Sequence, residues 1–226
     1  MPFVPPTALP TLPSLTVEEY ALKDVPQPDP LVFEPVQGTA KEILQKRQAE
    51  RERRVGKPLA VELSVTLGED RLVATVIHTD TVEGQVGAVQ VTYGGSVIYT
   101  VPLGQASPVH RLRGLWVHDG HWYLEVAAWQ GQGQVIQDGE SLNERYGYEK
   151  TFGFQLLHDR PFCFFHREGQ IGVFYEGQEI LLRYDYVPHY ACCSAADLNP
   201  VRAENMVAFF CLRDGVWYYV EIGVYD

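Results

Sequence analysis

From Leu59 onward, apolar and more polar residues alternate along the chain with a period of two. The first run places five aliphatic residues on one face of an extended segment: Leu59, Val61, Leu63, Val65 and Leu67. Alternate side chains of a strand share a face, so this run predicts a β-strand. The turn signal Gly68-Glu69-Asp70 then predicts that the chain returns as a second strand over residues 72–79.

Six further turn signals separate the short apolar and aromatic runs that follow. They are Gly94-Gly95, Asp119-Gly120, Asp138-Gly139, Glu168-Gly169, Glu176-Gly177 and Asp214-Gly215. Asp-Gly and Gly-Gly favour type I′ hairpins, in which both central residues have positive φ, and Glu-Gly supplies a glycine at the second position only. Together these signals predict a β-meander in which Gly139 and Gly177 adopt positive φ.

The chain also repeats itself. The segment 83–89 (EGQVGAV) returns as 168–174 (EGQIGVF), and the segment 135–148, which ends in Arg145-Tyr146-Gly147-Tyr148, returns as 173–186, which ends in Arg183-Tyr184-Asp185-Tyr186. Gly84, Gly131, Gly169 and Gly215 mark equivalent points at a spacing of roughly 40–50 residues, the period of four-stranded propeller blades. We therefore expect the two Arg-Tyr segments to occupy equivalent positions in successive sheets.

The repeats predict an all-β fold of four antiparallel β-meander units, over residues 59–107, 108–147, 148–187 and 188–226. The last unit is irregular, because the stretch from His189 to Asn205 holds few strand formers. An exposed sheet edge invites aggregation. We therefore expect the N-terminal segment Leu31-Val32-Phe33-Glu34 to cover that edge.

Turn glycines in this chain precede aromatic-rich strands, as in the run Arg213-Asp214-Gly215-Val216-Trp217-Tyr218-Tyr219-Val220-Glu221. With the repeats, such runs resemble the blades of bacterial TolB-like and WD40-like β-propellers over about residues 59–226. The resemblance implies a propeller-like scaffold whose central channel serves for binding, and it implies no catalytic residue. The alternative architecture is a β-sandwich or a partly open barrel built from the same hairpins.

The N-terminal region differs in composition from the β region. Nine prolines make residues 1–38 a Pro-rich extended leader, in which Thr16 and Glu19 have the spacing to cap one short helical turn. A charged surface helix and linker are predicted over residues 39–58, because Thr39 and Glu42 form a capping box and the run 40–54 lacks Gly and Pro. A single β-repeat domain then fills residues 59–226.

Composition narrows the possible partners. The formal net charge of −11 would repel a phosphate backbone, so no nucleic acid is expected. No stretch approaches the ~18 consecutive apolar residues of a membrane-spanning helix. A signal peptide removed ahead of the leader would give an extracytoplasmic location, and the compartment therefore stays open.

Histidines and cysteines supply the candidate metal ligands. His118 and His121 bracket the Asp119-Gly120 turn, where two imidazoles could share a cation. His189, Cys192 and Cys193, with Cys163 or Cys211, offer the ligand types of a Cys₃His zinc site. The spacing matches no common zinc motif, so no metal is predicted. The cysteines are either buried free thiols or form a disulfide between Cys192 or Cys193 and Cys163 or Cys211, and the sequence leaves both alternatives open.

Enzyme signatures are missing from the chain. It has no phosphate loop, no Gly-x-Ser-x-Gly elbow and no His-Glu-x-x-His helix. The acidic residues Glu125, Glu221, Asp185 and Asp214 recur near aromatic residues, as a carbohydrate-cleaving site would need, but the sequence does not give their separation. We predict no catalytic residue and no cofactor.

These patterns favour a non-catalytic binding or protein-interaction module, with an unknown protein or a small-molecule or carbohydrate ligand as its partner. An exposed aromatic cluster should then bind the ligand: Trp116, Trp122, Trp129, Tyr146, Tyr148, Tyr184 and Tyr186. The alternative is a hydrolase or metal-binding protein that uses the His118/His121 hairpin or the His189/Cys192/Cys193 loop.

Overall fold

The computed structural model describes residues 15–22, 61–81, 84–105, 112–127, 133–189, 199–202 and 205–223. These residues form four antiparallel sheets of four strands each and one short helix, α2 (Leu142–Tyr146). The predicted all-β class with four meander units is therefore confirmed. Within the described part of the chain, no helix is long and apolar enough to cross a membrane.

Each of the first three sheets is built from consecutive strands. Sheet 1 contains β2 (Glu62–Leu67), β3 (Asp70–Thr81), β4 (Gly84–Tyr93) and β5 (Ser96–Gln105). Sheet 2 contains β6 (Leu112–His118), β7 (His121–Ala127), β8 (Gly133–Gln137) and β9 (Glu140–Ser141). Sheet 3 contains β10 (Lys150–Leu157), β11 (Arg160–Arg167), β12 (Gln170–Tyr175) and β13 (Gln178–Tyr184).

Sheet 4 takes its outer strand from the N-terminal leader. Its order is β14 (Val201–Arg202), β15 (Met206–Arg213), β16 (Val216–Gly223) and then β1 (Thr16–Ala21). β1 pairs antiparallel with β16 over all six of its residues. A leader segment thus covers this edge, as expected, but it is residues 16–21, whereas residues 31–34 lie outside the described part.

The predicted helical turn capped by Thr16 and Glu19 is wrong. Both residues belong to β1, where Thr16 is paired with Gly223 and Glu19 with Val220. A capping-box spacing is a local signal, and the hydrogen-bond ladder offered by the free edge of β16 overrides it. The predicted helix over residues 40–54 lies outside the described residues.

All seven predicted turns connect strands where the sequence placed them. The Asp-Gly and Glu-Gly pairs have positive φ at both central residues, as type I′ turns require. Gly139 and Gly177 have φ of 87° and 77°, so that prediction is confirmed. An eighth turn, His158-Asp159, adopts the same conformation without a glycine and gave no sequence signal.

The repeat holds through three strands and fails at the fourth. Gly84, Gly169 and Gly215 lie at the connection between the second and third strands of sheets 1, 3 and 4, and Gly131 falls between β7 and β8, outside the described residues. The prediction that the two Arg-Tyr segments are equivalent is wrong, because Tyr146 ends α2 whereas Tyr184 ends β13. The left-handed Gly147, with φ of 71°, caps the helix, whereas the segment 180–182 (ILL) continues as a strand.

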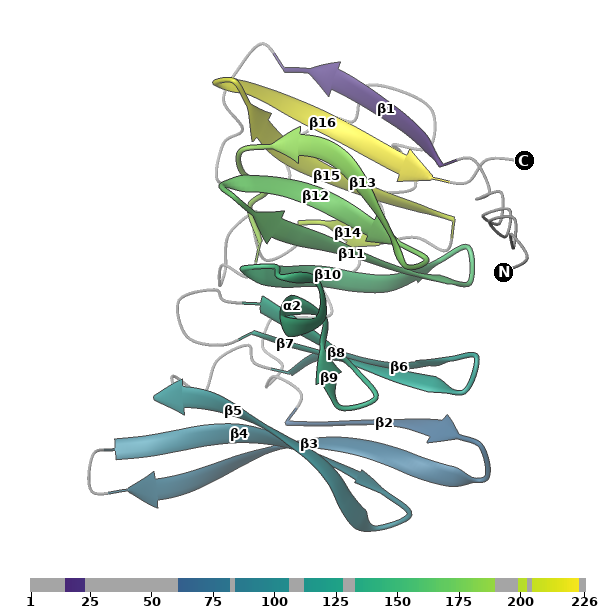
Figure 1. Cartoon of the computed structure of the whole chain (residues 1–226), viewed down its shortest axis with the longest axis vertical. Helices are drawn as coiled ribbons and strands as arrows, with labels where there is room; N and C mark the ends of the chain where they lie inside the picture. Colours follow the sequence, from purple (N-terminus) through teal and green to yellow (C-terminus); the bar gives the residue numbers. More distant parts are fainter. Residues whose placement is uncertain are drawn as a thin grey trace, which may run out of the picture.

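The four sheets stand in a column with sheets 1 and 4 at opposite ends (Figure 1). Three apolar layers separate them: one between sheets 1 and 2 includes Leu124, one between sheets 2 and 3 includes Phe154, and one between sheets 3 and 4 includes Phe209. Within each sheet the neighbouring strands are antiparallel. The first and last sheets do not meet to close a ring.

Candidate functional site

The aromatic residues expected to form one exposed cluster are spread over sheets 2 to 4. Trp122, Tyr148 and Tyr184 are only 6%, 5% and 0% exposed. Trp116 and Tyr146 are partly buried. Tyr186 is 47% exposed, and Trp129 lies outside the described residues. The expectation of an exposed cluster is therefore wrong.

These rings are buried because they pack between the sheets. Tyr148 stacks on Phe165 with ring centroids 4.4 Å apart, and Tyr184 meets Phe209 edge-on at 5.6 Å. Aromatic pairs in such offset or edge-on geometries stabilise a core beyond the area they bury. The aromatic content of the chain is thus used mainly for packing between the sheets.

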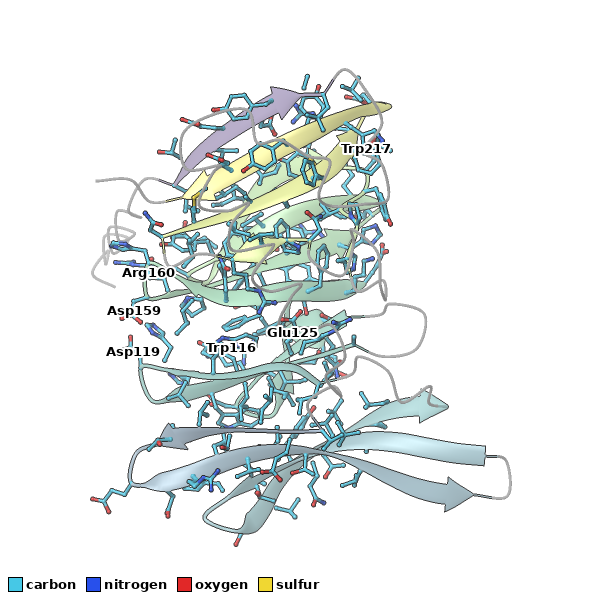
Figure 2. All side chains as sticks on the ribbon, turned by 180° about the vertical axis from the view of Figure 1, so that it is seen from behind. Trp116, Asp119, Glu125, Asp159, Arg160 and Trp217 are labelled. Atoms are coloured by element: carbon cyan, nitrogen blue, oxygen red, sulfur yellow. The ribbon has the colours of Figure 1, made fainter. Side chains whose placement is uncertain are left out.

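His118 and His121 face each other across their turn, as expected, but their imidazoles contact different groups. His118 lies between two carboxylates, with Nε2 3.4 Å from Asp119 and Nδ1 3.5 Å from Asp159. Figure 2 shows Asp119 and Asp159 on neighbouring hairpins of sheets 2 and 3. His121 Nδ1 lies 2.5 Å from Asp138. No three His, Cys, Asp or Glu side chains converge as metal ligands within the described ranges.

His189 packs against the aromatic core residue Phe152. Its ring stacks on Phe152 with centroids 3.6 Å apart, and Nδ1 lies 2.6 Å from the carbonyl oxygen of Val187, to which it donates. Burial lowers the pKa of His189 to about 3, so the imidazole is neutral at pH 7. Cys192 and Cys193 lie outside the described residues.

The other two cysteines, Cys163 and Cys211, are buried free thiols. Burial raises the pKa of both thiols, so neither is a reactive thiolate at neutral pH.

A buried carboxylate joins sheets 2, 3 and 4. Glu125 on β7 is 0% exposed, and its two oxygens accept backbone N–H groups from Gly153 at 2.7 Å and Phe154 at 3.0 Å. Arg202 on β14 also donates to Glu125, at 3.1 Å, and its guanidinium lies 5.5 Å from the ring centroid of Trp116. Trp116 and Glu125 lie near the middle of the column (Figure 2).

This carboxylate has a structural reason to be there. β10 bulges between Phe152 and Gln155, so the N–H groups of Gly153 and Phe154 leave the ladder with β11 and need other acceptors. Two of the other carboxylates considered for carbohydrate chemistry are also engaged: Glu221 accepts the hydroxyl of Tyr219, and Asp185 accepts the backbone N–H of Asp214, both at 2.7 Å.

Most arginines of the described residues are paired with a carboxylate. The pairs are Arg145–Glu140, Arg160–Glu176, Arg167–Glu179, Arg202–Glu125 and Arg213–Glu19. Arg183, at the end of β13, is exposed and makes no hydrogen bond or ion pair within the described part of the chain. Arg183 therefore differs both from these pairs and from Arg71, which donates to the hydroxyl of Ser64 at 2.7 Å, and its surroundings are a candidate binding site.

A hollow of about 210 Å³ lies beside Arg183 on sheet 3. Its lining comes from three adjacent strands and the turn between β11 and β12: Phe165, Arg167, Glu168, Gln170, Ile171, Gly172 and Arg183. Phe165 is paired with Gly172, and Arg167 with Gln170, across β11 and β12. A Cβ on Gly172 would lie 2.4 Å from the ring of Phe165, so only glycine lets that ring lie over the strand.

A β-bulge in β13 places Arg183 at this hollow. β13 has three residues, 181–183, where β12 has only Gly172. Arg183 itself has φ of 56°, a left-handed conformation that is uncommon for a non-glycine residue. No sequence pattern indicates this site, since a bulge and a positive φ at an arginine follow from strand pairing and not from residue type.

Comparisons with protein-family models, with curated proteins and with solved structures found no match. A functional conclusion therefore depends on the geometry of this chain.

Proposed function

We propose that this protein is a non-catalytic binding module and that the hollow on sheet 3 is its ligand-binding site. The observation that supports this most is the backbone of Arg183. Outside a hairpin turn, a left-handed conformation at such a residue costs roughly 1–3 kcal/mol and persists only where the surrounding structure imposes it, and such residues cluster at active and ligand-binding sites. Here it sets an exposed cationic side chain beside a hollow.

The size of the hollow limits the ligand. Sites for drug-sized molecules are about 300–1,000 Å³. A hollow of about 210 Å³ fits a small molecule or one end group of a larger one, and it is too small for an oligosaccharide. Of the ligands considered from the sequence, a small molecule is therefore favoured over a carbohydrate chain.

The four antiparallel sheets of four strands each, with β1 completing the last, support the resemblance to propeller-like binding scaffolds. The alternative of a hydrolase or metal-binding protein has less support. His118 and His121 contact different carboxylates, and His189 is stacked on Phe152.

Nuclear magnetic resonance of the full chain tests the proposal. A panel of small neutral and charged ligands should include one that saturably shifts the amide signals of Gln170 and Gly172. Gln170→Trp would fill the hollow from an exposed strand position and should abolish these shifts, whereas Thr66→Trp, at an exposed position of β2, should leave them unchanged. A panel that never shifts these signals, or shifts that survive Gln170→Trp, would show that the hollow is not a binding site.

A further inference from the structure

We propose that the ligand of the sheet 3 hollow carries a small oxyanionic group, a carboxylate or a phosphate, which Arg183 binds together with Arg167 and Gln170. This inference rests on the proposed binding function and adds the chemical class of the ligand. It follows from the hydrogen-bond donors, the charges and the fixed geometry of the lining.

The donors come from neighbouring strands. Arg167 uses two of the five guanidinium N–H groups on the carboxylate of Glu179, at 2.9 and 2.6 Å, and the others are available for a second acceptor. Gln170, its cross-strand partner, has an exposed amide. Arg183 adds a guanidinium that no described residue engages. Guanidinium forks match the geometry of carboxylate and phosphate oxygens.

Arg167 is held in place before any ligand arrives. Its guanidinium carbon lies 5.5 Å from the ring centroid of Phe165 and 5.8 Å from that of Tyr148. The hydroxyl of Tyr148 donates to Glu179 at 3.0 Å, and the hydrogen bonds from Arg167 lower the pKa of that carboxyl group. A side chain that is already ordered, as that of Arg167 is, loses little conformational entropy when it binds a ligand.

The charge balance at the hollow favours an anion. The positive charge of Arg167 is compensated by Glu179, whereas that of Arg183 is not compensated by an ion pair within the described residues. Glu168 also lines the hollow; its carboxylate is exposed on the turn and interacts electrostatically with Arg167, and its backbone N–H donates to Glu149 at 2.9 Å. The net charge of −11 repels anions at long range, yet salt at 0.15 M screens exposed charges beyond about 8 Å.

Titration of the full chain with acetate and with phosphate, at constant ionic strength, tests this proposal. Methyl acetate and glycerol are the neutral probes. Nuclear magnetic resonance follows the amide signals of Gln170 and Gly172 and the Nε–H signals of the arginines. We expect saturable shifts with at least one of the two anions, and the anion that binds identifies the source of the oxyanion. Arg183→Gly should weaken this binding at least about tenfold, because it removes a charged hydrogen-bond donor. Arg71→Gln, which removes an exposed arginine on sheet 1, should leave it unchanged.

Thermal unfolding of the same variants separates a ligand-binding role from a structural one. Arg183→Gly relieves a positive φ, so the midpoint should stay equal or rise while anion binding falls. Neutral probes that bind where both anions fail would overturn this inference and leave the binding function standing. Signals that no probe shifts would contradict both, and anion binding that is unchanged in Arg183→Gly would overturn the role of the arginine.

Discussion

Glu125→Gln tests whether one buried carboxylate holds three sheets together. Its two oxygens accept hydrogen bonds from Gly153, Phe154 and Arg202. Glutamine has a single carbonyl oxygen, so one backbone N–H of the β10 bulge would face an amide NH₂ group, and a buried donor without an acceptor costs about 1–3 kcal/mol. Arg202 would also lose its charged partner.

Breaking a buried ion pair costs about 3–5 kcal/mol, but the side chain of Arg202 is 34% exposed and water would compensate part of the loss. We therefore expect the free energy of unfolding to fall by about 3 kcal/mol, within the ranges given for these two effects. For a domain of this size that corresponds to a thermal midpoint lower by about 6–12 °C.

Urea unfolding followed by tryptophan fluorescence measures this change. Glu140→Gln is the matched control, because it removes a carboxylate from an exposed pair with Arg145, and such pairs contribute about 0–1 kcal/mol. If Glu125→Gln were no more destabilising than Glu140→Gln, at an unchanged dependence on urea, the proposed linking role of Glu125 would be refuted.

Two further predictions concern the docking of β1 and the hairpins. Burial of Glu19 opposes its ionisation, but hydrogen bonds from Arg213 and Tyr184 outweigh this and lower the pKa of Glu19. The stabilisation by ionised Glu19 is therefore present at pH 7 and is lost as the pH falls below about 4.3. Glu19→Gln should lower the free energy of unfolding by about 1 kcal/mol at pH 7. A difference of equal size between variant and wild type at pH 3 would contradict this role of the ionised carboxylate. Gly139→Val and Gly177→Val should each lower the free energy of unfolding by roughly 1–2 kcal/mol, because both glycines have positive φ. Thermal unfolding measures this change. Gly38→Val in the leader is the control, and an equally large loss of stability in this variant would refute the prediction.

The sequence could predict the hairpins because their signals are local. An Asp-Gly pair such as Asp138-Gly139 favours positive φ wherever it stands, so turn positions and the four-unit division follow from residue type. The same reasoning could not place the aromatic rings. Tyr184 and Tyr186 are two residues apart, yet one is 0% and the other 47% exposed, because β13 ends between them and packing on sheet 4 decides which ring is buried.

Local sequence signals also could not show which segment forms the outer strand of sheet 4. The sequence indicated that a leader segment would cover this edge, but the choice among leader segments depends on tertiary contacts. Glu19 accepts two hydrogen bonds from Arg213, at 3.0 and 2.8 Å, and one from Tyr184 at 2.6 Å. These partners are distant in the sequence, so no short sequence motif predicts the contacts between them.

Two bulges in sheet 3 show why the hollow, and not the buried carboxylate, is the better candidate for binding. Both bulges place a residue at positive φ, Gly153 on β10 and Arg183 on β13. In the first, glycine adopts the conformation at little cost, and Glu125 satisfies the backbone N–H groups that the bulge releases. In the second, an arginine bears the conformational cost and its guanidinium contacts no described acceptor. A structural bulge would be expected to resemble the first, so the second favours the hollow as the place where an acceptor from outside the described residues binds.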